Sequence, residues 1–131
     1  MSALIDSSAW IEFLRATESP VCVAVEDLLH EGAMVTDPVV MEILAGARDD
    51  GHLHQLRVVL SRAATVPVAP IDFESAAGLH RACRAKGETV RKMIDCLIAA
   101  IALRAGLPVL HADRDFDRLA RHTDLTVHPV S

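Results

Sequence analysis

The sequence is poor in cysteine and in aromatic residues, and it lacks a long apolar run. Its three cysteines (Cys22, Cys83 and Cys96) lie far apart without a Cys-x-x-Cys pair, which argues against a disulfide framework and a structural zinc site. Aromatic residues make up 3% of the chain, so base stacking can contribute little to nucleic-acid binding. Charged residues interrupt every apolar stretch, and no membrane span is predicted. Because no basic leader follows Met1, we expect no secretory signal and a cytoplasmic location.

Motifs of several common enzyme classes are missing too. The sequence contains no Walker loop, no glycine-rich dinucleotide loop and no nucleophile elbow. The acidic run 113–117 resembles the start of a calcium-binding loop, but Arg118 occupies the position that requires glycine, and no glutamate follows at the twelfth position. No histidine pair has the i, i+4 spacing of a zinc hydrolase. The sequence therefore supports none of these nucleotide, calcium or zinc sites.

Charge is distributed unevenly along the chain. The net charge of −5 would by itself discourage nucleic-acid binding, yet residues 1–80 carry −8 and residues 81–131 carry +3. Five basic residues open the C-terminal part: Arg81, Arg84, Lys86, Arg91 and Lys92. They could face an anion, or they could be the solvated faces of helices, and charge counting alone favours the second interpretation.

Short apolar segments alternate with helical patterns along the chain, and 131 residues suit one ordinary domain. Strands are predicted at residues 3–5, 33–35, 65–69, 109–111 and 125–130. Helices are predicted after Asp6 and at about 20–31, 37–47, 53–60, 73–85, 90–105 and 113–121. Such alternation implies right-handed crossovers and a mostly parallel sheet. We therefore predict a single α/β domain over residues 1–131, with three layers (α/β/α) and four or five short central strands.

Two acidic residues lie within apolar helical segments. Asp95 is the only charged residue of 93–103, and Glu42 lies within the apolar segment 39–45. A helix that is apolar on nearly all sides is buried on nearly all sides. A buried carboxylate then needs a proton, a cation or a metal. Asp95 alone could pair with Arg91 one turn earlier, but no basic residue of its own helix is available to Glu42.

Two further acids follow predicted strands. Asp6 ends the first strand, and Asp113 lies just after the strand at 109–111. The carboxyl ends of parallel strands share one edge of a sheet, and ligands bind there in open α/β folds. Glu42 and Asp95 lie early in helices that should start near the same edge. Although Asp6 alone could cap a helix, four gathered carboxylates favour a hard cation such as Mg²⁺ or Mn²⁺.

Four segments resemble the PIN-domain family, in the right order and at the family's domain length, and the closest match is its VapC toxin branch. They are Leu4-Ile5-Asp6-Ser7-Ser8, Met41-Glu42-Ile43-Leu44-Ala45-Gly46, Ile94-Asp95-Cys96-Leu97-Ile98-Ala99-Ala100 and His111-Ala112-Asp113-Arg114-Asp115-Phe116. The resemblance implies a Mg²⁺- or Mn²⁺-dependent endoribonuclease, the toxin of a type II toxin–antitoxin pair, which hydrolyses RNA phosphodiester bonds. It further implies a homodimer, a cognate VapB-like antitoxin as partner, and structured RNA such as tRNA as substrate.

The resemblance also implies roles for individual residues. The acidic quartet expected to carry catalysis consists of Asp6, Glu42, Asp95 and Asp113. The expected metal ligands are Asp6, Asp95, Asp113 and Asp115, whereas Glu42 is expected to orient the water shell of the ion. The residues expected to position substrate are Arg91, Lys92, Arg114 and His111. At His111 the family often has Thr or Ser, whose hydroxyl supports the acids, so His111 is expected either to take over that support or to contact substrate.

Two other functions fit parts of the sequence. An aspartyl phosphatase would use Asp6 as its nucleophile, but the acid-x-acid pattern is absent because Ser7 and Ser8 follow. A non-catalytic RNA- or protein-binding module could keep the fold and use the basic C-terminal part. Trapping a phosphoryl-aspartate would support the first alternative. RNA binding without cleavage in saturating Mg²⁺ or Mn²⁺ would support the second.

Overall fold

Strands and helices alternate along residues 1–130, which a computed structural model describes. The strands are β1 (Ala3–Ile5), β2 (Ala33–Thr36), β3 (Ala64–Val66) and β4 (Val109–Leu110). The helices are α1 (Ser7–Leu14), α2 (Pro20–Glu31), α3 (Asp37–Ala45), α4 (Asp50–Leu60), α5 (Pro70–Ala85), α6 (Met93–Ala105) and α7 (Arg114–His122). None of these helices is both long enough and apolar enough to span a membrane.

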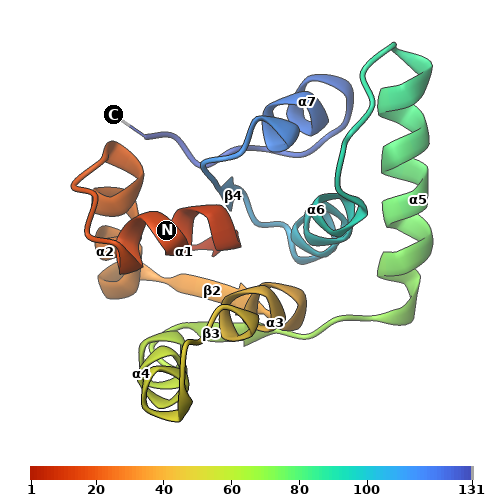
Figure 1. The fold of residues 1–131 in the computed structure, drawn as a ribbon. Coiled ribbons are helices and arrows are strands. Elements are labelled where there is room, and N and C mark those ends of the chain that lie inside the picture. Colours follow the sequence, from red (N-terminus) through yellow and green to blue (C-terminus); the bar gives the residue numbers. More distant parts are fainter. Residues whose placement is uncertain (131) are drawn as a thin grey trace.

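The four strands form one parallel sheet in the order β3-β2-β1-β4. Figure 1 shows the strands at the centre of the molecule, with α1 and α2 on one side and α5 and α6 on the other. Parallel neighbours need crossover connections, and the intervening helices provide them. The predicted three-layer α/β/α fold is confirmed, with four strands along residues 1–130. β3 lies at an edge of the sheet, as its neighbouring Pro67 predicts.

The core is built around α6, whose sequence is almost entirely apolar. Ile98 and Ile101 of this helix are fully buried, and Trp10 and Phe116 are the largest fully buried side chains. Burying one large apolar side chain stabilises a fold by about 1.5–3 kcal/mol. The same burial carries Asp95, in the first turn of α6, into the interior, where it is 3% exposed. The predicted burial of this helix is therefore confirmed.

The start of α6 differs from the prediction. Residues 90–92 are not helical, and α6 begins at Met93 instead of at about Val90. Val90 is buried in the core, and the Arg91 backbone N–H donates to Asp115 Oδ2 at 3.2 Å. This long-range hydrogen bond gives the Arg91 N–H a partner that the first turn of a helix could not provide, because the first four N–H groups of a helix have none within it. The segment leading into α6 is thereby tied to α7.

The prediction of a last strand at residues 125–130 is wrong. The segment makes a single parallel bridge, in which Val109 N–H donates to Thr126 O at 3.0 Å and His128 N–H donates to Val109 O at 2.9 Å. The ladder cannot continue because β4 has only two residues and Pro129 has no N–H.

Two helices begin earlier than predicted. Asp49 caps a helix, since its Oδ1 accepts from His52 N at 2.7 Å, and α4 begins immediately afterwards. Asp72, which the pattern predicts as the cap of a helix starting at residue 73, lies inside the first turn of α5. Its Oδ2 accepts from the backbone N–H of Ala69, the residue that precedes the helix, at 2.8 Å. Pro70, at the first position of α5, needs no N–H partner and makes the early start of that helix favourable.

Asp72 is buried and forms an ion pair outside the predicted site. It is 1% exposed, and Arg104 on α6 donates to both of its oxygens, from Nε at 2.8 Å and from a terminal nitrogen at 2.9 Å. The same guanidinium donates to Pro67 O at 2.6 Å. Its hydrogen bonds hold the pKa of Asp72 below the ordinary value. The pair fixes the start of α5 against the end of α6.

We expect Asp72→Asn to destabilise the protein by about 1–3 kcal/mol at pH 7, because an amide cannot replace the charge-assisted pair. The folded-state pKa of Asp72 is lowered, so its contribution is present above the ordinary value of 3.8 and is lost as the pH falls through the folded value. Urea denaturation measures both effects. Glu74→Gln, at an exposed acid of α5, is the control, and equal losses in the two variants would contradict the role of the pair.

Candidate metal centre

Two acids cap helices at the C-terminal edge of the sheet. Asp6 follows β1 and caps α1, where its Oδ2 accepts from Ser8 N at 3.1 Å. Asp113 follows β4 and caps α7, where its Oδ1 accepts from Asp115 N at 3.0 Å. Because β1 and β4 are adjacent parallel strands, their ends bring both acids to one edge. Capping engages one oxygen of each acid and leaves the other for a second role.

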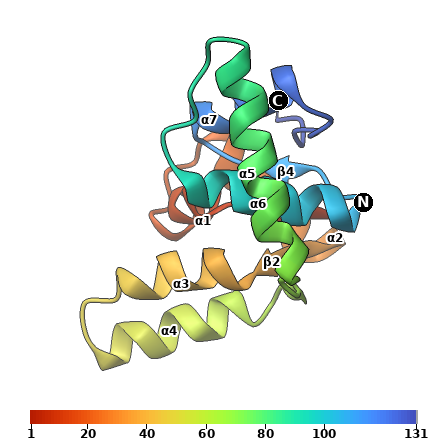
Figure 2. The same ribbon diagram turned by 90° about the vertical axis from the view of Figure 1, so that its right-hand side faces the viewer.

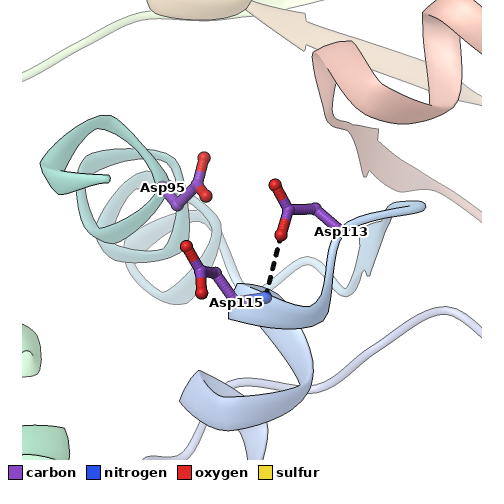
Figure 3. A group of neighbouring side chains, drawn as sticks. All are labelled: Asp95, Asp113 and Asp115. Carbon is purple, nitrogen blue, oxygen red and sulfur yellow. Dashed lines mark hydrogen bonds between the residues drawn. The ribbon is translucent and has the colours of Figure 1, made fainter. Parts of the chain in front are cut away.

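Three carboxylates lie close together beyond this edge. Asp95 in α6 and Asp113 and Asp115 at the start of α7 each place one oxygen within 4.8 Å of the others. Figure 3 shows the three side chains gathered around a common space, with Asp113 hydrogen-bonded to the Asp115 backbone. Asp95 and Asp115 are buried, and Asp113 is half-buried. We call Asp95, Asp113 and Asp115 the acid cluster.

Asp6 and Glu42 lie beside the acid cluster. Asp6 is 2% exposed, and its charge, after burial, contributes to raising the pKa of Asp95. Glu42 on α3 accepts from Ser7 Oγ at 3.0 Å. Burial and then the charge of Asp6 raise the pKa of Glu42, although the hydrogen bond from Ser7 opposes them. Three acids thus form the acid cluster, and Asp6 and Glu42 are its neighbours.

Burial and mutual repulsion give the acids different affinities for protons. Burial, followed by the charges of Asp6 and Asp113, raises the pKa of Asp95 to about 7. Burial also raises the pKa of Asp6. It acts in the same direction on Asp113, but the Asp115 N–H and two neighbouring basic side chains outweigh it and lower the pKa. At neutral pH Asp113 is therefore ionised, while Asp95 is present in both forms.

Three basic side chains neutralise part of this charge. Lys92 Nζ lies 3.5 Å from Asp113, and the Arg91 guanidinium lies 3.7 Å from Asp113 and 3.6 Å from Asp115. Arg118 on α7 pairs with the fully buried Asp115. The alternative pairing of Arg91 with Asp95 is therefore wrong. The Arg91 and Lys92 side chains remain 66% and 57% exposed, so both can also contact a ligand from solvent.

Two carboxylate oxygens find no partner among residues 1–130. Asp6 Oδ1 and Asp95 Oδ2 are buried and accept no hydrogen bond. Leaving such oxygens unsatisfied is costly. Hard cations such as Mg²⁺ and Mn²⁺ prefer oxygen donors of this kind. The residues therefore fit a divalent cation, with Asp115 the least available ligand because Arg91 and Arg118 already pair with it.

Comparison with known proteins decides the family. A family model described as PIN domain matches residues 3–122. The chain belongs to the PIN-domain family. Ribonuclease VapC11 of Mycobacterium tuberculosis is 48% identical over 126 residues, which cover 93% of this chain and 94% of that protein. The resemblance to the VapC branch is thereby confirmed.

Solved structures share the fold of this PIN domain. A chain of VapBC2 from Rickettsia felis, bound to a DNA fragment from its promoter, matches with a TM-score of 0.80 over 100% of both chains at 15% identity. A chain of VapBC-1 from nontypeable Haemophilus influenzae matches with a TM-score of 0.77, over 98% of this chain and 97% of that one, at 16% identity. At such low identities the likeness concerns the fold alone.

Two serines whose roles the sequence did not predict hold acids of this PIN domain in place. Ser8 Oγ donates to Asp6 Oδ2 at 2.6 Å and accepts from Ala112 N at 2.9 Å. It thereby joins the end of β1 to the loop between β4 and α7. Ser7 Oγ donates to Glu42 on α3. The available signal was their position directly after a strand-ending acid, where a short hydroxyl side chain reaches several neighbouring elements.

His111 and Arg114, both predicted to position substrate, have different surroundings. His111 Nδ1 accepts from Asp113 N at 3.1 Å, and Nε2 lies 3.4 Å from Asp117 Oδ1. The imidazole also packs on Phe116, with ring centroids 5.2 Å apart, and is 8% exposed. It therefore supports the loop that carries Asp113 and is not positioned at the surface. Arg114, at the first position of α7, is exposed.

We expect His111→Asn and His111→Gln to differ at the Asp113 amide. Asn can place an oxygen where Nδ1 stands, whereas the Gln amide reaches the position of Nε2, and both variants lose the packing on Phe116. Hydrogen exchange at the Asp113 N–H, followed by NMR, should stay slow in His111→Asn. It should become about fivefold faster in His111→Gln, the equivalent of one hydrogen bond of about 1 kcal/mol. Equal rates in the two variants would show that Nδ1 does not hold this amide.

Removing the charge of Asp95 should stabilise the metal-free protein at alkaline pH. The folded-state pKa of about 7 lies above the ordinary 3.8, so the stability linked to this group is present at low pH and is lost as the pH rises through about 7. In EDTA at about pH 8, we expect Asp95→Asn to exceed wild type by on the order of 2 kcal/mol. Urea denaturation between about pH 5 and pH 8 tests this expectation. Asp124→Asn, at an exposed acid, is the control, and a wild type as stable as Asp95→Asn at pH 8 would refute it.

Proposed function

We propose that this PIN domain is a divalent-metal-dependent endoribonuclease that acts as the toxin of a type II toxin–antitoxin pair. The proposal treats residues 1–131 as a single nuclease domain. Its main support is the pair of buried, unpartnered oxygens on Asp6 and Asp95 beside the acid cluster. The 48% identical relative is named a ribonuclease, which supports RNA as the polymer that is cut.

Asp6, Asp95 and Asp113 would hold the Mg²⁺ or Mn²⁺ ion, and Glu42 would orient its water shell. When bound, the ion would lower the pKa of a water molecule and neutralise charge that develops on the scissile phosphate. Mg²⁺ usually keeps several waters and takes only a few carboxylates. This preference agrees with a site in which the charge of Asp115 is already paired with Arg118.

Hydrogen bonds within the protein prepare these acids before any substrate arrives. Ser8 fixes Asp6, and Ser7 fixes Glu42, so neither carboxylate has to be ordered during the reaction. Such preorganisation is a main source of electrostatic stabilisation in enzymes. Because Ser8 binds Oδ2 of Asp6, the same contacts also fix the position of Oδ1, the buried oxygen without a partner.

Basic side chains and a proton on Asp95 adjust the charge of the site. With a pKa of about 7, Asp95 can release its proton near neutral pH when a cation approaches. Arg91 and Lys92, which are exposed beside Asp113, can neutralise phosphate groups of a bound RNA strand. Cleavage should consequently increase with pH through the neutral range.

A VapB-like antitoxin is the proposed partner, and the two solved structures described above are of VapBC proteins. A groove of about 270 Å³ lies between α1, α3 and α4 and reaches Glu42. Its lining includes Leu14, Ile43 and Leu56. Arg15, Arg48 and His52 line it as well, so an amphipathic antitoxin segment in this groove would approach Glu42. The homodimer and a structured RNA substrate such as tRNA are further proposals that rest on the family.

Asp95→Asn is the central test of the proposed chemistry. The variant should stay folded, bind Mn²⁺ at least about tenfold more weakly and cleave RNA more than about 100-fold more slowly than wild type. Isothermal titration calorimetry measures the metal affinity, and gel electrophoresis of total tRNA measures cleavage. Glu74→Gln removes the same charge at an exposed position of α5 and should behave as wild type.

Other outcomes would favour other functions. Cleavage by Asp95→Asn at the wild-type rate would remove Asp95 from the mechanism. A wild-type protein that binds RNA in saturating Mn²⁺ without cutting it would be a non-catalytic binding module. A phosphoryl group trapped on Asp6 would instead indicate an aspartyl phosphatase.

A further inference from the structure

Basic residues follow one another from the end of α5 to the start of α6. Arg81, Arg84 and Lys86 are exposed, and none of them forms an ion pair within residues 1–130. Arg91 and Lys92 continue the series beside the acid cluster. We call these five residues the basic ridge. Figure 2 shows that the C-terminal end of α5 extends beyond α6 and that one loop returns from it to α6.

Little negative charge is left near the outer part of the basic ridge. Glu88, the only acid of the loop, is bound by Arg121 at 2.8 Å and by His122 at 2.9 Å. The exposed acid of α5, Glu74, lies about two helical turns before Arg81. Cations near a helix C-terminus also stabilise the helix slightly, but that effect does not require several unpaired cations. The outer part of the ridge is therefore a positive surface without an internal counterion.

The basic ridge ends at the acid cluster. The loop at residues 86–92 joins the exposed end of α5, which carries Arg81 and Arg84, to the start of α6. At its inner end, Lys92 and Arg91 lie 3.5 Å and 3.7 Å from Asp113. A strand that follows the ridge would thus be led to the acids.

We propose that the basic ridge binds the RNA backbone outside the cleavage site and directs the strand to the acid cluster. The proposal rests on the proposed ribonuclease function and adds a second binding surface to it. The ridge supplies Arg and Lys side chains, which bind phosphates without reading the base sequence. An acidic protein segment could be attracted by the same charges. Because the basic ridge continues to the acid cluster, where RNA would be cut, RNA is favoured over an acidic protein segment as its ligand.

A pair of matched double variants tests the ridge. Arg81→Gln/Arg84→Gln removes two charges at the end of α5, and Arg57→Gln/Arg62→Gln removes two exposed charges at the end of α4. Arg84 and Arg57 each lie in the last turn of their helices, so the effects of these two substitutions on the helix dipoles are matched. Figure 1 shows that α4 and the C-terminal end of α5 lie at opposite ends of the molecule.

Binding of a fluorescein-labelled 20-nucleotide oligouridylate is measured by fluorescence anisotropy in EDTA, over a series of salt concentrations. Each phosphate contact with a single strand contributes about 0.7 to the slope of log affinity against log salt concentration. The slope of the ridge variant should therefore be smaller than that of wild type by about 1.4, and its affinity at 0.1 M salt should be lower by on the order of twentyfold. The α4 variant should stay close to wild type. In Mn²⁺ the ridge variant should show a raised KM for RNA cleavage and an unchanged kcat.

Several results would overturn the proposal. Equal losses in the two double variants would show that only the overall charge matters. Unchanged RNA affinity in the ridge variant, together with lost binding of labelled polyglutamate, would assign the ridge to an acidic protein instead. Ridge-dependent RNA binding by a wild-type protein that does not cleave RNA in Mn²⁺ would keep the ridge and remove the ribonuclease function, so the two failures are distinguishable.

Discussion

Carboxylates that are buried close together repel each other, and the surroundings of the acid cluster are arranged to compensate this repulsion. Each acid is compensated differently. Asp115 pairs with Arg118, and Asp113 lies beside Lys92. Asp95, whose pKa is raised to about 7, keeps its proton below that pH. A protein interior tolerates gathered acids only with such compensation. A divalent cation would add positive charge where the basic side chains do not reach.

The compensation depends on a segment that is not helical. The chain between α5 and α6 is irregular, with a turn at residues 86–87, and it is held where Val90 is buried and the Arg91 N–H is bound by Asp115. In a helix that began at Val90 the Arg91 N–H would have no partner, because the first four N–H groups of a helix find none within it, whereas here Asp115 accepts from it and links the segment to α7. The irregular backbone therefore brings basic side chains to the acids, and it connects the acid cluster to the exposed end of α5.

Much of the fold could be predicted from the sequence because its signals are local. Apolar periodicity, caps and strand-ending acids indicated the alternating elements, and the apolar surroundings of Asp95 indicated a buried carboxylate. The contacts that were missed join residues far apart in the chain. Ser8 reaches Ala112, and Arg104 reaches Asp72, and no local pattern marks either pair. The placement of His111 depends equally on a loop that only the folded sheet defines.

The two-residue strand β4 lies at an edge of the sheet, where a single parallel bridge to the segment around Val127 covers its outer side. An uncovered edge strand is a template on which other chains can add strands and aggregate. The same bridge steadies the strand from which Asp113 departs. A few backbone contacts near residue 127 therefore protect the protein from association and hold one of its acids, so solubility and site geometry would deteriorate together if this segment detached.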